Sequence, residues 1–169
     1  GYATPGTWLR YDATHNAFAP TGITVTAPGD YSKVIVRRAF VPSLDGAVKV
    51  PVEIVSLPGT RRDGSAPTIL TAYGAYGIIT RPYFIGPLLA FLERGGVYAQ
   101  AMIRGGGEYG ESWHLAAKLA TKTKSADDLA AAAGWLAKNG YGNAQHLGII
   151  GGSAGGFLMG LALTRNPER

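Results

Sequence analysis

Residues 147–156 read LGIIGGSAGG, and this stretch predicts the fold. Its first four residues form an apolar run that is typical of a buried β-strand, and a helix is expected to begin near Ala154. Between strand and helix, Gly151, Ser153 and Gly155 form the pattern Gly-x-Ser-x-Gly. This pattern presents a nucleophilic serine on a sharp turn, because glycines two residues before and after the serine let the strand and the helix pass closely.

The turn therefore indicates nucleophilic catalysis by Ser153. Ala154 supplies a backbone N–H at the start of a helix that is expected to run to about Arg165, and this N–H favours the negative charge that develops on a reacting carbonyl oxygen. The alternative is an ordinary glycine turn that caps a helix. The apolar run before the serine and the helical sequence after it favour the nucleophile, since the motif requires both.

Two further strand and helix units precede this turn. Residues 68–73 and 97–103 are short apolar runs, typical of buried parallel strands. Helical spacing predicts a helix over residues 83–94, and a capping box at Ser125 opens an Ala-rich helix that ends before Gly140. The alternation predicts an α/β fold whose mostly parallel sheet carries helices on both faces.

An antiparallel hairpin is expected before the parallel strands. Residues 33–41 and 48–55 are two β-rich runs, and the linking Asp45-Gly46 is a strong hairpin signal. Pro51 has no N–H to donate, which predicts that its strand lies at a sheet edge. Residues 1–28 are expected to form strand and loop, with too little apolar surface for a core of their own.

Composition narrows the function classes. The chain has 169 residues, which allows one domain or part of one. Its net charge is +5, but the basic residues are scattered, so no nucleic-acid partner is expected. Zero cysteines exclude disulfides, thiolate catalysis and Cys-ligated zinc. Neither a metal-ligand cluster nor a phosphate-binding loop is found, so no cofactor or metal is expected.

Targeting signals are not found in the sequence. No apolar run approaches the roughly 18 residues of a membrane span, so no membrane partner is expected. The first residues lack an initiator Met and a signal pattern, which we interpret as an internal start. The sequence leaves the compartment open between cytoplasm and periplasm.

A second donor for the reacting oxygen is expected from the loop after residues 68–73. Here that loop contains Tyr73, Gly74 and Tyr76. The Tyr73 hydroxyl, or a backbone N–H made accessible by Gly74, would supply the donor. From the residues alone, the two tyrosines are equally compatible with a packing role.

Several motifs together resemble the prolyl oligopeptidase family of serine peptidases, including its oligopeptidase B branch. Residues 104–114, RGGGEYGESWH, resemble the family signature RGGGEYG-x-x-WH, and residues 126–129, ADDL, resemble its helix opening before the serine strand. Residues 138–141, KNGY, and then GGSAGG follow at the family's spacing. Ala154 is closer to oligopeptidase B, because prolyl oligopeptidase typically has Asn there.

The resemblance implies a domain organisation and site roles. Residues 29–169 would be the amino-terminal part of an α/β-hydrolase peptidase domain, and residues 1–28 the end of a β-propeller and the crossover from it. Tyr73 falls on the oxyanion-hole tyrosine, and Tyr76 falls near the aromatic wall of the S1 pocket. Thr71-Ala72 departs from the family, whose members usually have Tyr-Gly there.

The implied activity is cleavage of short peptides after Pro or a basic residue, through an acyl-enzyme on the serine. The implied partners are a short peptide substrate, the rest of the catalytic domain, and the β-propeller, which would limit access to the site. An esterase or lipase-like acyl hydrolase is an alternative, because the fold does not determine the substrate. A catalytically dead interaction module is another.

The catalytic acid and base are not expected within this sequence. The α/β-hydrolases place them after the nucleophile, and the sequence ends sixteen residues after Ser153. Asp127 and Asp128 are interpreted as helix-capping residues. The three histidines are interpreted as surface or packing residues; they are His15, His114 and His146. We therefore expect the isolated chain to be inactive.

Overall fold

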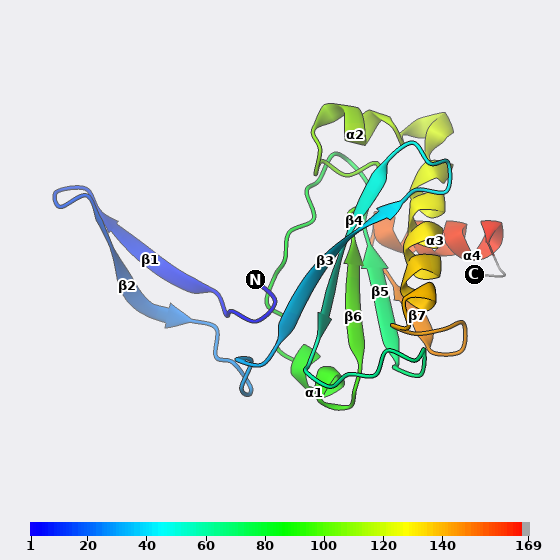
Figure 1. Ribbon diagram of the computed structural model, residues 1–169. Helices are drawn as coiled ribbons and strands as arrows, with labels where there is room; N and C mark the ends of the chain where they lie inside the picture. The colour runs from blue at the N-terminus through cyan, green and yellow to red at the C-terminus, as the bar shows by residue number, and fades with distance from the viewer. Residues whose placement is uncertain (167–169) are drawn as a thin grey trace.

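A computed structural model describes residues 1–166, whose body is a five-stranded sheet of order β3-β4-β6-β5-β7 (Figure 1). The strands of this sheet are β3 (Ile35–Pro42), β4 (Lys49–Ser56), β5 (Thr68–Ala72), β6 (Val97–Ala101) and β7 (Leu147–Ile150). The helices are α1 (Leu88–Glu93), α2 (Glu111–Leu115), the 3-10 turn η1 (Leu119–Thr121), α3 (Thr123–Lys138) and α4 (Ala154–Arg165). The last helix has the start and the end that the sequence predicts.

The strand directions confirm the predicted sheet. β5 pairs in parallel with both β6 and β7, whereas β4 is antiparallel to both β3 and β6. Within residues 1–166, β4 is thus the one strand of this sheet that runs against the other four. The fold is α/β, with an initial antiparallel hairpin leading into a mostly parallel sheet.

The prediction that Pro51 marks an edge strand is wrong, because β4 lies between β3 and β6. The Pro51 carbonyl accepts the N–H of Met102 at 2.9 Å, one residue beyond the last β4–β6 pair, Val52 with Ala101. In an antiparallel pair the N and O of one residue face the same neighbour. The absent N–H of Pro51 therefore falls at the end of this ladder, where an inner strand tolerates it.

The predicted helix over residues 83–94 forms only as α1, from Leu88 to Glu93. Pro87 restricts the residue before it to non-helical conformations, so the helix begins after it. The preceding apolar residues lie in a loop instead, where Phe84 packs on Tyr31 with ring centroids 4.8 Å apart. The apolar spacing there reflects packing of a loop.

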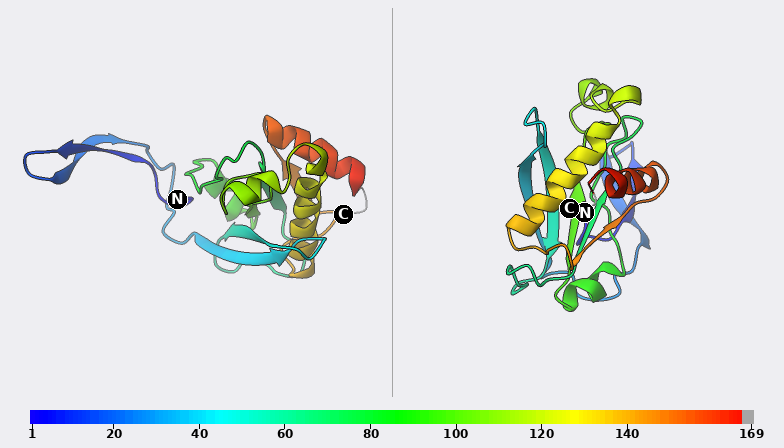
Figure 2. Two further views of the ribbon diagram at one scale, coloured as in Figure 1. Left: turned by 90° about the horizontal axis from the view of Figure 1, so that it is seen from above. Right: turned by 90° about the vertical axis from the view of Figure 1, so that its right-hand side faces the viewer.

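Helices cover both faces of the sheet, as predicted (Figure 2). The helices α3 and α4 pack on the face that carries Val52, Leu70 and Ala99, which are completely buried. The short helix α1 packs on the opposite face, against Tyr98. The strand β7 was expected to be buried. In the described part of the chain it lies at one edge of the sheet, and Ile150 is 58% exposed.

The amino-terminal residues form a separate hairpin of β1 (Thr7–Asp12) and β2 (Ala17–Thr24), which extends away from the sheet (Figures 1 and 2). It exposes large apolar side chains, among them Trp8 and Phe18. Strand and loop without a core of their own are what the sequence predicts here. Tyr2 is the exception, because it is buried against the main body and its hydroxyl donates to Gln100.

Candidate active site

Ser153 occupies a strained turn between β7 and α4. Its backbone has φ 54° and ψ −126°, a combination that residues other than glycine rarely adopt. The strand ends at Ile150 and the helix begins at Ala154, so the chain reverses from strand to helix within three residues. The serine side chain is exposed at this turn.

Both glycines of the Gly-x-Ser-x-Gly pattern are required by close backbone contacts. A Cβ atom on Gly151 would lie 2.5 Å from the carbonyl oxygen of Gly155, and one on Gly155 would lie 2.9 Å from that of Ala72. Backbone atoms cannot move aside as a flexible side chain can. These contacts also pack the start of α4 on the end of β5, where the Tyr73 ring lies close to Gly155.

Three cavities of the described residues adjoin the serine turn, and Gly151 and Gly152 border one of about 440 Å³. Tyr73 and Gly152 border a second, open cavity of about 320 Å³. Tyr76, which has φ 57° and is 75% exposed, borders a third cavity of about 500 Å³ together with Ala154. As the first residue of α4, Ala154 has a backbone N–H without a partner inside the helix. The structure thus gathers the residues singled out in the sequence around the turn of Ser153.

Two of the three histidines lie away from this turn. His15 is exposed in the connection between β1 and β2, where its Nδ1 lies 2.7 Å from a carboxylate oxygen of Asp12. His146 directly precedes β7, at the end of the strand opposite the serine turn, and its Nδ1 lies 2.9 Å from Oδ1 of Asn143. Both are surface residues, as expected.

The third histidine, His114, lies beside the serine turn. It belongs to α2 and borders the same cavity as Ala154. Its Nδ1 lies 2.9 Å from the carbonyl oxygen of Gly105, so this nitrogen is already engaged. Within residues 1–166, no histidine forms a hydrogen bond with Ser153.

Gly105 and Gly107 allow close packing of two backbone segments. They lie against residues 73–77, which we call the tyrosine loop. A Cβ on Gly105 would overlap the carbonyl oxygen of Gly74, and one on Gly107 would overlap that of Gly77. The N–H of Gly77 also donates to the carbonyl of Gly105 at 3.1 Å. These contacts explain two of the three glycines, Gly105 and Gly107.

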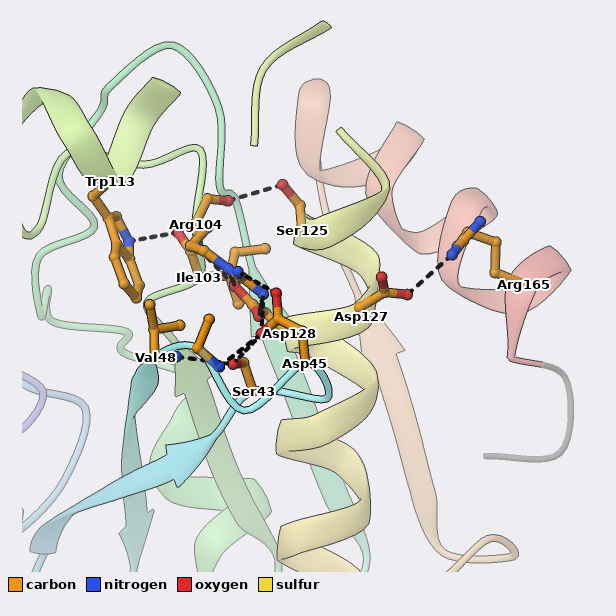
Figure 3. A network of polar contacts seen from close by, with 11 residues as sticks. Ser43, Asp45, Val48, Ile103, Arg104, Trp113, Ser125, Asp127, Asp128 and Arg165 are labelled. Atoms are coloured by element: carbon orange, nitrogen blue, oxygen red, sulfur yellow. Dashed lines mark hydrogen bonds and ion pairs between the residues drawn. The ribbon is translucent and has the colours of Figure 1, made fainter. Parts of the chain in front are cut away.

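Arg104 joins three segments through a buried ion-pair network (Figure 3). Its guanidinium donates to Asp128 of α3, at 2.9 Å from Nε and 2.6 Å from a terminal nitrogen. It also donates to Asp45, in the β3–β4 turn, at 2.7 Å. Arg104 is only 2% exposed. Three of the motifs that were singled out in the sequence therefore meet at one buried cation.

The network shifts the pKa values of its three charged side chains. The bonds to Asp128, and secondly to Asp45, raise the pKa of Arg104 despite its burial. The bond from Arg104 is the largest cause that holds the pKa of Asp45 well below its usual range. Burial raises the pKa of Asp128, and the bonds from Arg104 oppose that effect.

The capping interpretation of residues 125–128 is wrong. The helix α3 begins two residues earlier, at Thr123. The Ser125 hydroxyl donates instead to the carbonyl of Arg104 at 2.8 Å, and Asp127 pairs with Arg165 at 3.3 Å (Figure 3). No local pattern in the sequence links Arg104 to Asp128, because the two residues are 24 positions apart.

Sequence reasoning also missed Lys122. Its ammonium donates to the carbonyl of Gly74 in the tyrosine loop, and to the hydroxyl of Ser125 at 3.1 Å. Burial of this side chain lowers the pKa of Lys122. Its sequence neighbours are polar and charged, so nothing in the local pattern distinguished it from a surface lysine.

The residues that the structure describes hold no group of three or more side chains placed to bind a metal ion. Among their helices, none combines the length and the apolar character needed to cross a membrane.

Comparison with known proteins gives consistent similarities. The model of the prolyl oligopeptidase family matches residues 83–169. Dipeptidyl aminopeptidase BI of Pseudoxanthomonas mexicana is 36% identical over 176 residues, which cover 96% of this chain and 24% of that protein.

Solved structures agree with this result. A structure from a study of two prolyl endopeptidases superposes with a TM-score of 0.91 at 37% identity, covering 99% of this chain and 24% of that one. Oligopeptidase B of Leishmania major superposes with a TM-score of 0.88 at 32% identity, covering 99% and 23%. The chain thus spans about a quarter of the length of the relatives it matches.

Proposed function

This chain belongs to the prolyl oligopeptidase family, and on that premise we propose that Ser153 is the nucleophile of a serine peptidase in the protein that carries it. The observation that carries this proposal is the conformation of Ser153, with φ 54° between two glycines that leave no room for a side chain. Such strain costs about 1–3 kcal/mol and persists only where the surroundings impose it. An ordinary helix cap needs no such strain, so the geometry favours a nucleophile.

The reaction proceeds in two stages. The Ser153 hydroxyl oxygen attacks the peptide carbonyl carbon while its proton passes to a base, and the carbonyl oxygen becomes negatively charged. The Tyr73 hydroxyl and the Ala154 N–H donate hydrogen bonds to that oxygen. Breakage of the C–N bond, with the proton passing to the leaving amine, gives the acyl-enzyme. Water then releases the acid and regenerates Ser153.

The base and its orienting carboxylate are assigned to the rest of the parent protein. The three histidines of this chain are engaged elsewhere or distant from the turn, and a serine hydroxyl is a poor nucleophile without a base within reach. The 169-residue polypeptide by itself is therefore expected to show negligible turnover. Residues 1–28 are assigned to the end of a β-propeller and its crossover, and residues 29–169 to the hydrolase domain.

The proposed substrates are short peptides, cleaved after Pro or a basic residue. The names of the relatives support a peptide substrate, since they comprise a dipeptidyl aminopeptidase, a prolyl endopeptidase and an oligopeptidase B. Tyr76 is assigned to the wall that contacts the substrate, because its exposed ring borders the cavity beside Ala154.

The test uses the full-length protein with a fluorophosphonate probe, which reacts with activated serines. We expect labelling that Ser153→Ala abolishes and that Ser112→Ala, at an exposed serine of α2, leaves intact. Peptides with Pro or Arg before the scissile bond should be hydrolysed faster than short acyl esters. Faster ester hydrolysis would indicate an esterase, and absence of labelling would indicate an inactive module.

A further inference from the structure

We propose that Lys122 is a positioning residue, which fixes the tyrosine loop so that Tyr73 faces the oxygen of the reacting carbonyl. This inference rests on the proposed role of Tyr73 in the oxyanion hole. Lys122 itself is assigned no contact with the substrate. It acts through the carbonyl of Gly74, the residue next to Tyr73, to which its ammonium donates a hydrogen bond.

The carbonyl of Gly74 needs this donor. Gly74 is buried and has φ 57°, and a Cβ on it would overlap the side chain of Ile103. Gly105 packs so closely on the Gly74 oxygen that a Cβ there would overlap it too. A carbonyl removed from water without a partner is costly, and the Lys122 ammonium supplies the partner.

Lys122 is itself held in place by a rigid element. It lies between η1 and α3, and its ammonium also donates to the hydroxyl of Ser125 at 3.1 Å. Ser125 is completely buried and donates onward to the carbonyl of Arg104 at 2.8 Å. One lysine thus links the tyrosine loop to the start of a sixteen-residue helix and to the loop after β6.

The position of Tyr73 depends on how this loop leaves β5. The start of α4 packs on the same point, because the Cβ position of Gly155 lies 2.9 Å from the carbonyl oxygen of Ala72 and 3.7 Å from the Tyr73 ring. If the carbonyl of Gly74 lost its donor, the loop would rotate to hydrate it, and the Tyr73 hydroxyl would move relative to Ser153. A displacement of about 1 Å in such a group lowers rates about 100-fold.

A lysine that merely stabilises the fold would alter the unfolding midpoint without a selective effect on the chemical step. A positioning lysine acts through Tyr73, so its removal should matter little once the Tyr73 hydroxyl is gone. Non-additivity of the two substitutions is the signature that separates these roles.

The experiment measures kcat, KM and the urea unfolding midpoint of the full-length protein on a peptide substrate. Lys122→Met is expected to lower kcat about 10- to 100-fold with KM changed less than about threefold. Lys122→Arg, which keeps N–H donors, is expected to retain most of kcat. Lys124→Met removes the same charge two residues further along, in α3, and is expected to leave both constants unchanged.

The decisive comparison is Lys122→Met in the Tyr73→Phe background, where the further loss of kcat should be less than about threefold. A further loss equal to that of Lys122→Met alone would overturn the inference while leaving the proposed function intact. If Tyr73→Phe itself left kcat unchanged, the proposed role of Tyr73 would fail instead. Should Lys122→Met not fold, Lys122→Gln carries the same comparison, with a smaller loss in the same direction.

Discussion

Arg104 and Asp128 form a buried ion pair with two side-chain hydrogen bonds, at 2.9 Å and 2.6 Å, and a third bond from the Arg104 backbone N–H at 3.0 Å. The pair attaches the loop after β6 to α3, and Asp45 extends it to the β3–β4 turn. The loop after β6 also contacts the tyrosine loop, because the carbonyl of Gly105 accepts the N–H of Gly77 at 3.1 Å. These motif residues therefore join segments of the scaffold that lie far apart in the sequence.

Asp128→Asn is expected to lower the free energy of unfolding by about 3–5 kcal/mol, because it leaves the Arg104 cation buried with one partner fewer. The matched control is Asp127→Asn at the neighbouring position, whose ion pair with Arg165 is partly exposed and contributes less than about 1 kcal/mol. Urea unfolding of the full-length variants measures both. If both variants lowered the free energy of unfolding by the same small amount, the buried pair would not have a supporting role.

The Asp45 carboxylate is expected to contribute to the free energy of unfolding, and this contribution should be lost in acid. Arg104 lowers the pKa of Asp45 in the folded state, so the folded state binds fewer protons there than the unfolded chain does. The stabilisation is complete above the unfolded pKa of about 3.9 and is lost as the pH falls through the lower folded value.

Comparison with Asp45→Asn isolates this effect. The unfolding midpoints of the two proteins should differ by a constant amount near neutral pH, and the difference should shrink below about pH 4. Unfolding in urea between pH 6 and pH 2 measures it. A difference that stays constant over the whole range would show that the Asp45 carboxylate does not carry the contribution.

The need for a glycine at position 155 can be tested against a second glycine of α4, Gly160. Gly155→Ala puts a Cβ against the carbonyl of Ala72, so we expect fluorophosphonate labelling of Ser153 to slow at least about 10-fold, through displacement of the turn. Gly160→Ala lies five residues further along α4 in open space and should keep the labelling rate. It should also stabilise the helix by about 0.5–1 kcal/mol. Similar labelling rates for both variants would argue against a tight turn.

The strand and helix alternation and the serine turn were predictable from the sequence, because they depend on local patterns. An apolar run followed by Gly-x-Ser-x-Gly predicts a strand, a tight turn at the serine and a helix after it. The wrong predictions depended on the neighbours in space. Pro51 is tolerated in an inner strand because the ladder ends there, and the apolar residues before Pro87 pack as a loop.

The roles of the polar residues also depended on neighbours in space, which local sequence patterns do not reveal. Asp128 has the sequence context of a helix cap but is a buried partner of a residue 24 positions away. Lys122 has the context of a surface lysine, but its partner Gly74 is 48 positions away. No periodicity connects such positions, so their pairing becomes visible only when the loops after β5 and β6 are placed beside α3.

Tyr73→Phe tests the proposed oxyanion donor most directly. Loss of one such donor costs about 100- to 1,000-fold in kcat, and we expect a loss in this range in the full-length protein. KM should change little, because the hydroxyl acts on the charged oxygen of the transition state rather than on the bound substrate. The ring keeps its position near Gly155, so the unfolding midpoint should stay the same.

The control for this prediction is Tyr109→Phe. It removes a hydroxyl from an exposed tyrosine that packs on Trp113, and it should leave kcat unchanged. An increase in KM alone would place the Tyr73 hydroxyl on the ground-state substrate, and no change in either constant would reduce Tyr73 to a packing residue.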